Sequence, residues 1–309
     1  MTKAKTELPP IHDVDIRQLR LFKIVVECGG LTAAELPLGM SCSTISRHLT
    51  ALEKRFNLHL CERGRSGFRL TTNGLAVYTA VIDLLDALET FRSQLSDKKK
   101  LLTGDISLWI TDNSHNEKCN PLRQILTRFG NRPGSVKITL NAADPGSVEN
   151  AVAAGVAQIG ITISNNHLSG LKYEKISEEI ASIYCAANHP LGKALSDGTF
   201  SESQLQDVDF VERGYLRNDV LVSRYSWKST AVSQHIEATL QLILTGTFVG
   251  IIPEHVAERW VESDQIRKIA WDDPASIATV NLVWRQSATR NLIVNAMLDD
   301  IRFVYKNLQ

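Results

Sequence analysis

The sequence predicts an α/β protein that begins with an all-α winged helix-turn-helix and continues through a long linker helix. Three observations predict this fold. Residues 31–71 hold two short helical patterns that meet at a tight turn, and a small basic hairpin follows them. Residues 72–98 carry one uninterrupted helical pattern. From residue 104 onward, strand and helix patterns alternate, which is typical of a parallel sheet with helices on its faces.

The first helices are predicted from the signals at their ends. A Gly-Gly pair at 29–30 ends an apolar-periodic helix, whose apolar positions are Ile16, Leu19, Phe22, Val25 and Val26. Thr32 precedes Glu35 by three residues, the spacing of a capping box that starts a second helix. Pro37 is expected to end or kink this helix early, because proline cannot extend it. Ser41 then follows as a strong N-cap candidate for a third helix.

The third helix has one apolar face and one hydrogen-bonding face. Apolar residues at three- and four-residue spacing predict a buried face of Ile45, Leu49, Leu52 and Phe56. The opposite face carries short or flexible polar side chains near the helix N-terminus, where a recognition helix contacts base edges and phosphates. The DNA-binding candidates on it are Ser41, Cys42, Ser43, Thr44, Ser46, Arg47, His48 and Thr50. Lys54 and Arg55 lie farther along, where phosphate contact is expected.

A basic hairpin follows this helix. Two strand-like runs, at 58–63 and 67–70, are joined by Gly64-Arg65-Ser66, and the glycines allow a tight turn. The positive side chains at its tip are predicted to hold the backbone beside the flanking minor groove: Arg63, Arg65 and Arg69. Residues 40–70 hold six basic and two acidic side chains, although Lys+Arg and Asp+Glu both total 34 in the whole chain. A local basic surface on a neutral chain favours specific DNA binding.

This segment resembles the winged helix-turn-helix of LysR-type transcriptional regulators. The residues that carry the resemblance are Ser41, Ser46, Arg47, Leu52, Glu53, Leu60, Cys61, Arg63, Leu70, Thr71 and Gly74. The chain departs from the common pattern at Cys42 and Ser43, where much of the family has Gln and Pro, and at Pro37. The resemblance implies a DNA-binding domain at 14–71, a linker or dimerisation helix at 72–100 and an effector-binding domain at 104–309.

The long helix carries an apolar heptad stripe. Its members are Val77, Val81, Leu84, Leu88, Phe91 and Leu95, and this spacing favours a coiled-coil seam. The alternative is an ordinary helix that packs on its own domain. In the family the equivalent helix pairs two subunits, so the resemblance implies a homodimer and, by further likeness, a homotetramer. A dimer presents two recognition helices on one face of double-stranded DNA, which predicts a roughly palindromic site.

The remaining two-thirds alternates strands and helices. Strands are predicted at 105–110, 136–140, 158–163, 183–186, 208–211, 248–252, 266–270 and 280–284, and helices near 122–129, 148–154, 236–244 and 291–307. The runs PLRQILTRF, AVAAGVAQIGI and ILTGTFVGIIPEHVAER resemble the family's effector-binding domain. The resemblance implies a two-lobed, periplasmic-binding-protein-like domain, with lobe I at 104–163 and 270–309 and lobe II at 168–265. The chain is expected to cross between lobes near 163–168 and 265–270.

An effector cleft is expected at the carboxyl ends of the parallel strands, beside helix N-termini. The candidates there are Thr111, Asn113, Ser114, Asp144, Thr162, Ser164, Tyr215, Thr247 and Phe248. Hydroxyls and backbone N–H groups at helix starts favour an anionic group, which suggests a small anionic metabolite. Taken singly, each of these residues is also an ordinary turn or cap residue. The acidic residue that the family commonly has near Gln158 is absent.

Three function classes follow from these patterns. The leading hypothesis is a transcription regulator controlled by a small molecule. An enzyme is disfavoured, because no catalytic, nucleotide-binding or zinc motif is present, and no cofactor or metal is expected. An architectural DNA protein with a ligand-free C-terminal domain is the third class. Five scattered cysteines, a polar N-terminus and no membrane-length apolar run indicate a cytoplasmic protein.

Overall fold

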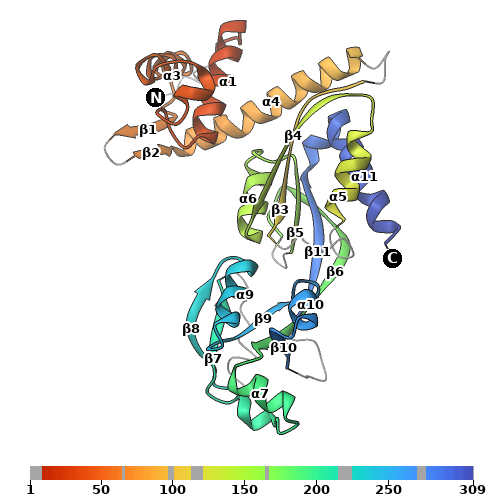
Figure 1. The fold of residues 1–309 in the computed structure, drawn as a ribbon. Helices are drawn as coiled ribbons and strands as arrows, with labels where there is room; N and C mark the ends of the chain where they lie inside the picture. Colours follow the sequence, from red (N-terminus) through yellow and green to blue (C-terminus); the bar gives the residue numbers. More distant parts are fainter. Residues whose placement is uncertain are drawn as a thin grey trace. The chain divides into compact units, whose positions relative to one another are not determined.

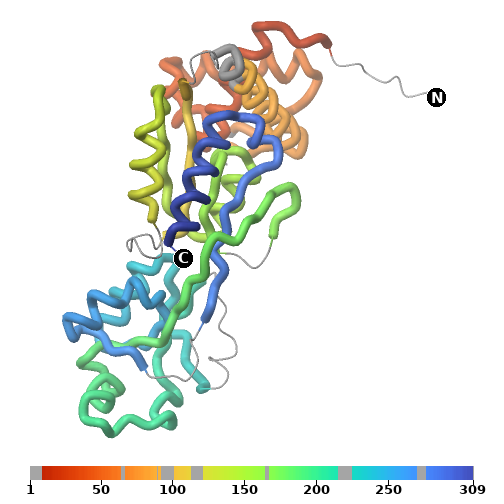
Figure 2. The backbone as a smooth tube through the Cα atoms, turned by 90° about the vertical axis from the view of Figure 1, so that its right-hand side faces the viewer, coloured from red at the N-terminus to blue at the C-terminus, as the bar shows by residue number. Residues whose placement is uncertain are grey.

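A computed structural model of the chain describes residues 9–64, 67–96, 101–112, 121–163, 167–214, 225–269 and 276–308. The chain forms two compact units, Met1–Asp97 and Lys98–Gln309. Figures 1 and 2 show the elements of each unit from two directions. The N-terminal unit is helical apart from one short hairpin, whereas the C-terminal unit is built on a large mixed sheet.

The N-terminal unit holds helices α1 (Asp13–Glu27), α2 (Glu35–Leu38), α3 (Cys42–Phe56) and α4 (Thr72–Ser96), and a hairpin of β1 (Cys61–Gly64) and β2 (Gly67–Leu70). Its core contains the predicted apolar faces of α1 and α3 and the start of α4: Leu19, Phe22, Val25, Ile45, Leu49, Leu52, Tyr78, Val81 and Ile82. The rings of Phe22 and Tyr78 meet edge to face, with centroids 6.4 Å apart. The helix-turn-helix and its wing, predicted from sequence, are therefore formed.

The second helix starts differently from the prediction. The capping box of Thr32 and Glu35 is wrong, because α2 begins after Ala34 without a side-chain cap. The Glu35 carboxylate instead accepts a hydrogen bond from the backbone N–H of Cys42, at the start of α3. The first N–H groups of a helix need acceptors from outside it, and Glu35 supplies one. The early end was predicted correctly, since α2 has four residues and Gly39 follows at φ +60°.

The long helix α4 begins against the hairpin. Thr71 Oγ1 donates to the carbonyl of His59 at 2.6 Å and accepts from the backbone N–H of Gly74 at 2.9 Å. A Cβ on Gly74 would lie 1.8 Å from the carbonyl oxygen of Leu60, so only glycine fits this approach. Within the unit α4 packs on α1. Phe91, in the predicted seam, is 60% exposed.

The C-terminal unit contains a nine-stranded sheet of order β4-β3-β5-β11-β6-β9-β7-β8, with β10 beside β6. Its first half holds β3 (Leu102–Thr111), parallel to β4 (Gly134–Ala143) and β5 (Ile159–Ile163). Helices α5 (Leu122–Gly130) and α11 (Leu292–Lys306) cover one face and α6 (Pro145–Ala153) covers the other, as Figure 1 shows. These elements contain the strands and helices predicted for this part of the chain.

The second half of the sheet holds β7 (Asp209–Arg213), which is parallel to β8 (Lys228–Ser233) and β9 (Val249–Pro253). Helices α7 (Pro190–Ser196), α9 (Ile236–Leu244) and α10 (Glu254–Glu262) accompany these strands, with β10 (Ile266–Lys268) and the 3₁₀ helix η2 (Glu202–Leu205). Another 3₁₀ helix, η3 (Gln286–Arg290), follows β11 and packs with α11 in the first half. The predicted helix at 236–244 is confirmed.

Two long strands join the halves. β6 (Leu171–Ala186) pairs with β11 (Ser276–Arg285) along most of its length, and its last residues pair with β9 and β10. Figures 1 and 2 show both strands extending from one half of the unit to the other. The chain thus passes between the halves within continuous strands. The lobe boundaries expected from sequence stay a prediction.

Candidate functional site

The N-terminus of α3 carries a small group of linked hydroxyls. Ser41 caps the helix, as predicted, because its Oγ accepts from the backbone N–H of Thr44 at 3.4 Å. The same Oγ lies 3.0 Å from the hydroxyl oxygens of Ser43 and Thr44. Arg47 Nη2 donates to Thr44 Oγ1 at 3.3 Å. These hydrogen bonds order the first turn and the arginine that follows it.

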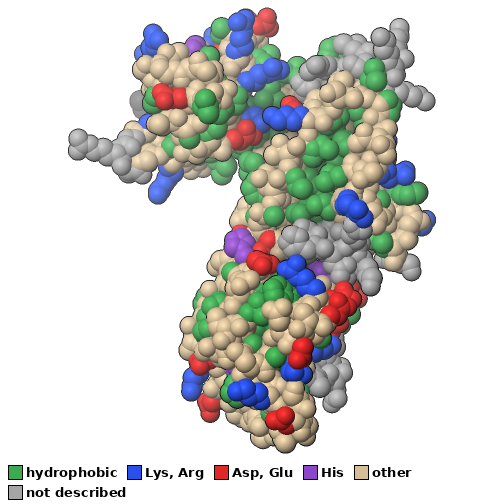
Figure 3. All heavy atoms as spheres, in the orientation of Figure 1, with side chains coloured by type: hydrophobic (Ala, Val, Ile, Leu, Met, Phe, Trp, Pro, Cys, Tyr) green, Lys and Arg blue, Asp and Glu red, His purple; other side chains and the backbone are tan. Residues whose placement is uncertain are grey.

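The polar face of α3 lies outside the core of the N-terminal unit. The exposed candidates are Ser41, Ser43, Arg47 and Thr50, and the half-buried ones are Cys42, Thr44, Ser46 and His48. Ile45, Leu49 and Leu52 on the opposite face are each at most 1% exposed. Figure 3 shows Lys and Arg side chains on the surface of this unit. Contact of this face with DNA stays a prediction.

The wing arginines have different surroundings. Arg63 forms an ion pair with Glu53, and its Nη1 donates to the carbonyl of Ser46 at 3.2 Å. Its side chain is only 19% exposed, so this arginine fixes the hairpin to α3. Arg69 on β2 is exposed, and Arg65 lies outside the described residues.

Arg55 is held inside the N-terminal unit. Its Nε donates to Asp15 Oδ1 at 3.0 Å, and its Nη2 donates to the carbonyl of Pro10 at 2.8 Å. Hydrogen bonding to Arg55, with a further bond from the backbone of His12, lowers the pKa of Asp15. The expectation of a phosphate contact by Arg55 does not match this geometry. Lys54 is exposed.

In the C-terminal unit, polar side chains line up across neighbouring strands. Thr111 Oγ1 of β3 donates to Thr162 Oγ1 of β5 at 3.2 Å, and Asn281 of β11 is the strand partner of Thr162. All three are buried, at 5%, 0% and 4% exposure. A Cβ on Gly160 would contact α6, so Thr162, two residues on, lies on the same sheet face. Two of the predicted cleft residues, Thr111 and Thr162, are therefore in direct contact.

Asp144 acts as a helix cap. Its Oδ1 accepts from the backbone N–H of Ser147 at 3.0 Å at the start of α6. Burial by itself would raise the pKa of Asp144, but the hydrogen bonds from Ser147 outweigh it and the pKa is lowered. Asp144 is therefore the cap residue that the turn preferences of aspartate also predicted.

Four titratable or charged side chains gather beyond the ends of β3 and β7, and we call Asp112, Glu179, Arg213 and His235 the charged cluster. Asp112 Oδ2 lies 2.8 Å from His235 Nδ1 and accepts from the backbone N–H of Ile236 at 3.2 Å, at the start of α9. Glu179 of β6 is 6% exposed and Arg213 is 2% exposed. Burial raises the pKa of Glu179 to about 7, with Arg213 opposing the shift and Asp112 adding to it.

Sequence reasoning missed part of this cluster. Glu179 follows Glu178 in a run rich in charged residues, and such a run resembles an exposed segment. No residue near His235 in the sequence indicated a hydrogen-bonding partner for it. Thr247 and Phe248 precede β9, at the end where the parallel strand β7 begins, so the structure does not bring them to Arg213. The other predicted cleft residues lie outside the described residues: Asn113, Ser114, Ser164 and Tyr215.

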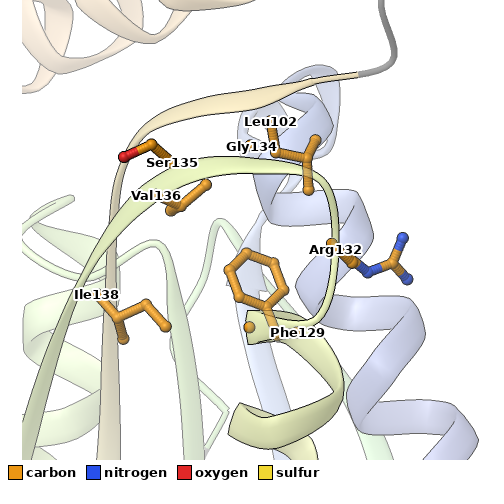
Figure 4. Close-up of a pocket in the computed structure, with 8 residues that line it drawn as sticks. Leu102, Phe129, Arg132, Gly134, Ser135, Val136 and Ile138 are labelled. Atoms are coloured by element: carbon orange, nitrogen blue, oxygen red, sulfur yellow. The ribbon is translucent and has the colours of Figure 1, made fainter.

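A separate pocket lies at the opposite ends of β3 and β4. It has a volume of about 200 Å³ and is lined by Leu102, Phe129, Gly130, Arg132, Gly134, Ser135, Val136 and Ile138. Figure 4 shows that apolar side chains line it, while the guanidinium of Arg132 points away. Arg132 Nε donates to Asp300 at 2.7 Å. This pocket contains none of the predicted cleft residues.

In the parts of the chain that the structure describes, no three His, Cys, Asp or Glu side chains group as metal ligands, and no helix is long and apolar enough to cross a membrane.

Comparison with solved structures supports the fold. Full-length OxyR from Pseudomonas aeruginosa aligns with a TM-score of 0.68 at 16% identity, over 95% of this chain and 96% of that chain. Full-length LysG from Corynebacterium glutamicum with bound effector Arg aligns with a TM-score of 0.59 at 18% identity, over 93% and 97%. Full-length CbnR complexed with its target DNA aligns with a TM-score of 0.57 at 18% identity, over 94% and 99%.

Sequence comparison identifies the family. The LysR substrate binding domain matches residues 119–304, and the helix-turn-helix of bacterial regulatory proteins of the lysR family matches residues 16–75. The HTH-type transcriptional activator BauR of Pseudomonas aeruginosa is 33% identical over 97% of this chain and 99% of its own length. The chain therefore belongs to the LysR family of DNA-binding transcriptional regulators, which are not enzymes, and carries the family's helix-turn-helix and effector-binding domains.

Proposed function

We propose that the exposed polar face of α3 reads an operator sequence and that a small molecule bound between the two halves of the C-terminal sheet controls this binding. The proposed domains are the DNA-binding domain at 14–71, the linker helix at 72–100 and the effector-binding domain at 104–309. The observation that carries the DNA-binding part is the ordered, exposed first turn of α3, with Arg47 held by Thr44 at 3.3 Å. The solved complex of CbnR with its target DNA has the same fold.

Fluorescence anisotropy with the promoter DNA beside the gene for this chain tests the first part. We expect Arg47→Ala to weaken DNA binding. It should also reduce the salt dependence of the association constant, because binding without the arginine releases fewer counterions from the DNA. Arg290→Ala removes the same charge from an exposed site in the C-terminal unit and is the matched control. Unchanged affinity and salt slope in Arg47→Ala would refute the proposed interface.

The effector part rests on the row of buried polar side chains at Thr111, Thr162 and Asn281, beside the start of α6. A ligand that binds only the folded chain raises its stability, so metabolites can be screened by thermal shift. Thr162→Val removes one hydroxyl from the proposed cleft, and Thr139→Val on the exposed side of β4 is its control. A saturable shift that survives Thr162→Val unchanged would place the effector elsewhere. The absence of any effector would favour the architectural role.

We further propose a homodimer paired through α4, which can assemble into a homotetramer, acting on double-stranded DNA in the cytoplasm. The exposed Phe91 late in α4 supports this pairing. Light scattering of the full chain tests it, with Phe91→Glu expected to lower the mass to that of a smaller assembly. Thr79→Glu, at an exposed position near the start of α4, is the control.

A further inference from the structure

The charged cluster sits where the halves of the C-terminal sheet meet, and its composition carries information about the ligand. From it we infer that the effector bears a positively charged nitrogen together with its carboxylate, as an amino acid does. The inference rests on the proposed function, because it names the ligand class for that same cleft. It narrows the small, anionic metabolite expected from sequence to one that also carries a cationic nitrogen.

The two oxygens of Asp112 differ in their hydrogen bonding. Oδ2 accepts from the backbone N–H of Ile236 at 3.2 Å and lies 2.8 Å from His235 Nδ1. Oδ1 is buried and has no hydrogen-bond partner among the described residues. A buried acceptor without a donor destabilises the folded chain. A ligand N–H group placed at Oδ1 would remove that destabilisation.

A second acid lies close to the first. Glu179 is 6% exposed, and its pKa of about 7, raised first by burial, includes a contribution from the charge of Asp112. Ser177 lies two residues earlier on the same face of β6, and its hydroxyl oxygen is buried without a hydrogen-bond partner in the described part of the chain. This surface therefore offers acceptors for a donor-rich cationic group.

The balance of charge separates two ligand classes. The charged cluster contains two acids, Asp112 and Glu179, and one arginine, Arg213, beside His235. A ligand with only a carboxylate would add a further negative charge near the buried Glu179 and the half-buried Asp112, and charge interactions are strong where water is excluded. A ligand with an ammonium group places that cation beside Asp112 and Glu179. Its carboxylate is then left to Arg213.

Calorimetric titration of the full chain tests the ligand class with matched probes. The probes are standard amino acids and ω-amino acids. Each probe is compared with two matched molecules: the carboxylic acid that lacks the amino group, and the amine that lacks the carboxylate. We expect an amino acid to bind and its matched acid to bind at least about tenfold more weakly. Asp112→Asn and Glu179→Gln should each weaken amino-acid binding to a similar extent. Glu178→Gln is the control, because Glu178 is exposed and pairs with Lys175 at 2.6 Å.

The uptake or release of protons on binding is a second measurement, and its direction distinguishes the two ligand classes. A cation beside Glu179 favours its ionised form, so binding near pH 7 should release protons, whereas a ligand with only a carboxylate should cause proton uptake. Titrations in two buffers of different ionisation enthalpy measure this exchange. Glu179→Gln should abolish the release, and Glu178→Gln should retain it.

Each contrary result has a distinct meaning. A carboxylic acid that binds as tightly as its amino counterpart, or binding that takes up protons, overturns the ligand class and leaves a cleft effector in place. Failure of every amine-bearing probe to bind also overturns the ligand class. A ligand whose affinity is unchanged in Asp112→Asn, Glu179→Gln and Thr162→Val overturns the cleft itself, and with it the proposed function.

Discussion

Glu53 of α3 and Arg63 of the β1–β2 hairpin form an ion pair whose side chains are only 13% and 19% exposed. The Glu53 carboxylate also accepts the backbone N–H of Leu60 at 2.8 Å, and Arg63 donates to the carbonyl of Ser46 at 3.2 Å. One acid thus ties the helix, the loop after it and the hairpin together. The position of the wing relative to α3 depends on this contact.

Glu53→Ala should destabilise the N-terminal unit by about 2–3 kcal/mol, because it leaves a half-buried guanidinium and a backbone N–H without their acceptor. Urea titration with hydrogen-exchange detection over residues 42–64 measures this unit separately. Glu62→Ala, at an exposed position on β1, should change stability by less than about 0.5 kcal/mol. Equal effects of the two substitutions would contradict the role of Glu53.

Gly74→Ala should also destabilise this unit, since the new Cβ would lie 1.8 Å from the carbonyl oxygen of Leu60. Backbone atoms at that distance must move, and overpacking of this kind costs about 1–3 kcal/mol or more. Gly130→Ala in α5 meets nothing within 4 Å and is the matched control. It should be neutral or stabilising by up to about 1 kcal/mol, because alanine is the better helix former. Thermal unfolding of both variants measures the difference.

Local signals in the sequence predicted many of the helices. Ser41 and the periodic apolar residues after it mark α3, and Asn291 caps α11 by accepting from the backbone N–H of Ile293 at 2.8 Å. Such signals act within one or two turns, so they can be found along the chain. The Thr32–Glu35 spacing misled, because Glu35 bonds to the next helix instead.

The strand residues that the sequence did not predict depend on pairing between segments far apart in the chain. Only residues 183–186 of β6 were predicted as a strand, although β6 spans Leu171–Ala186. Its earlier part is rich in Lys and Glu and becomes a strand through its pairing with β11, about a hundred residues away. The candidate cleft residues follow the same division. Strand ends identified Thr111 and Thr162, whereas Glu179 joins the charged cluster only because β6 crosses the sheet.

Asp300→Ala should destabilise the C-terminal unit by about 1–3 kcal/mol, because Arg128 and Arg132 lose a shared buried acceptor while their side chains, 44% and 34% exposed, keep contact with water. Asp300 is fully buried and accepts from Arg128 Nε at 2.6 Å and from Arg132 Nε at 2.7 Å. Asp299→Ala is a control at the next position, where the side chain is 69% exposed and lies 3.6 Å from Arg302. It should cost less than about 1 kcal/mol. Equal losses of stability in the two variants, measured by denaturant unfolding, would refute the role of Asp300.

Glu179 should make the C-terminal unit less stable as pH rises from about 4.5 to 7. Its pKa is raised to about 7 in the folded chain, from a model-peptide value near 4.3, because burial disfavours the charged form. Between these values the folded state binds more protons than the unfolded state, so stability falls with rising pH and levels off above the folded pKa. Below about pH 4 the penalty is absent, since both states are protonated.

Replacing the carboxyl group with an amide removes this titration. Stability of Glu179→Gln, measured by urea unfolding between pH 4.5 and 8, should therefore decline less steeply toward neutral pH than that of the unaltered chain. Glu178→Gln should keep the original slope, because Glu178 is exposed to solvent on the neighbouring position of β6. Parallel pH profiles for the unaltered chain and Glu179→Gln would show that folding does not shift the pKa of Glu179. In that case burial would not be the dominant influence on its carboxyl group.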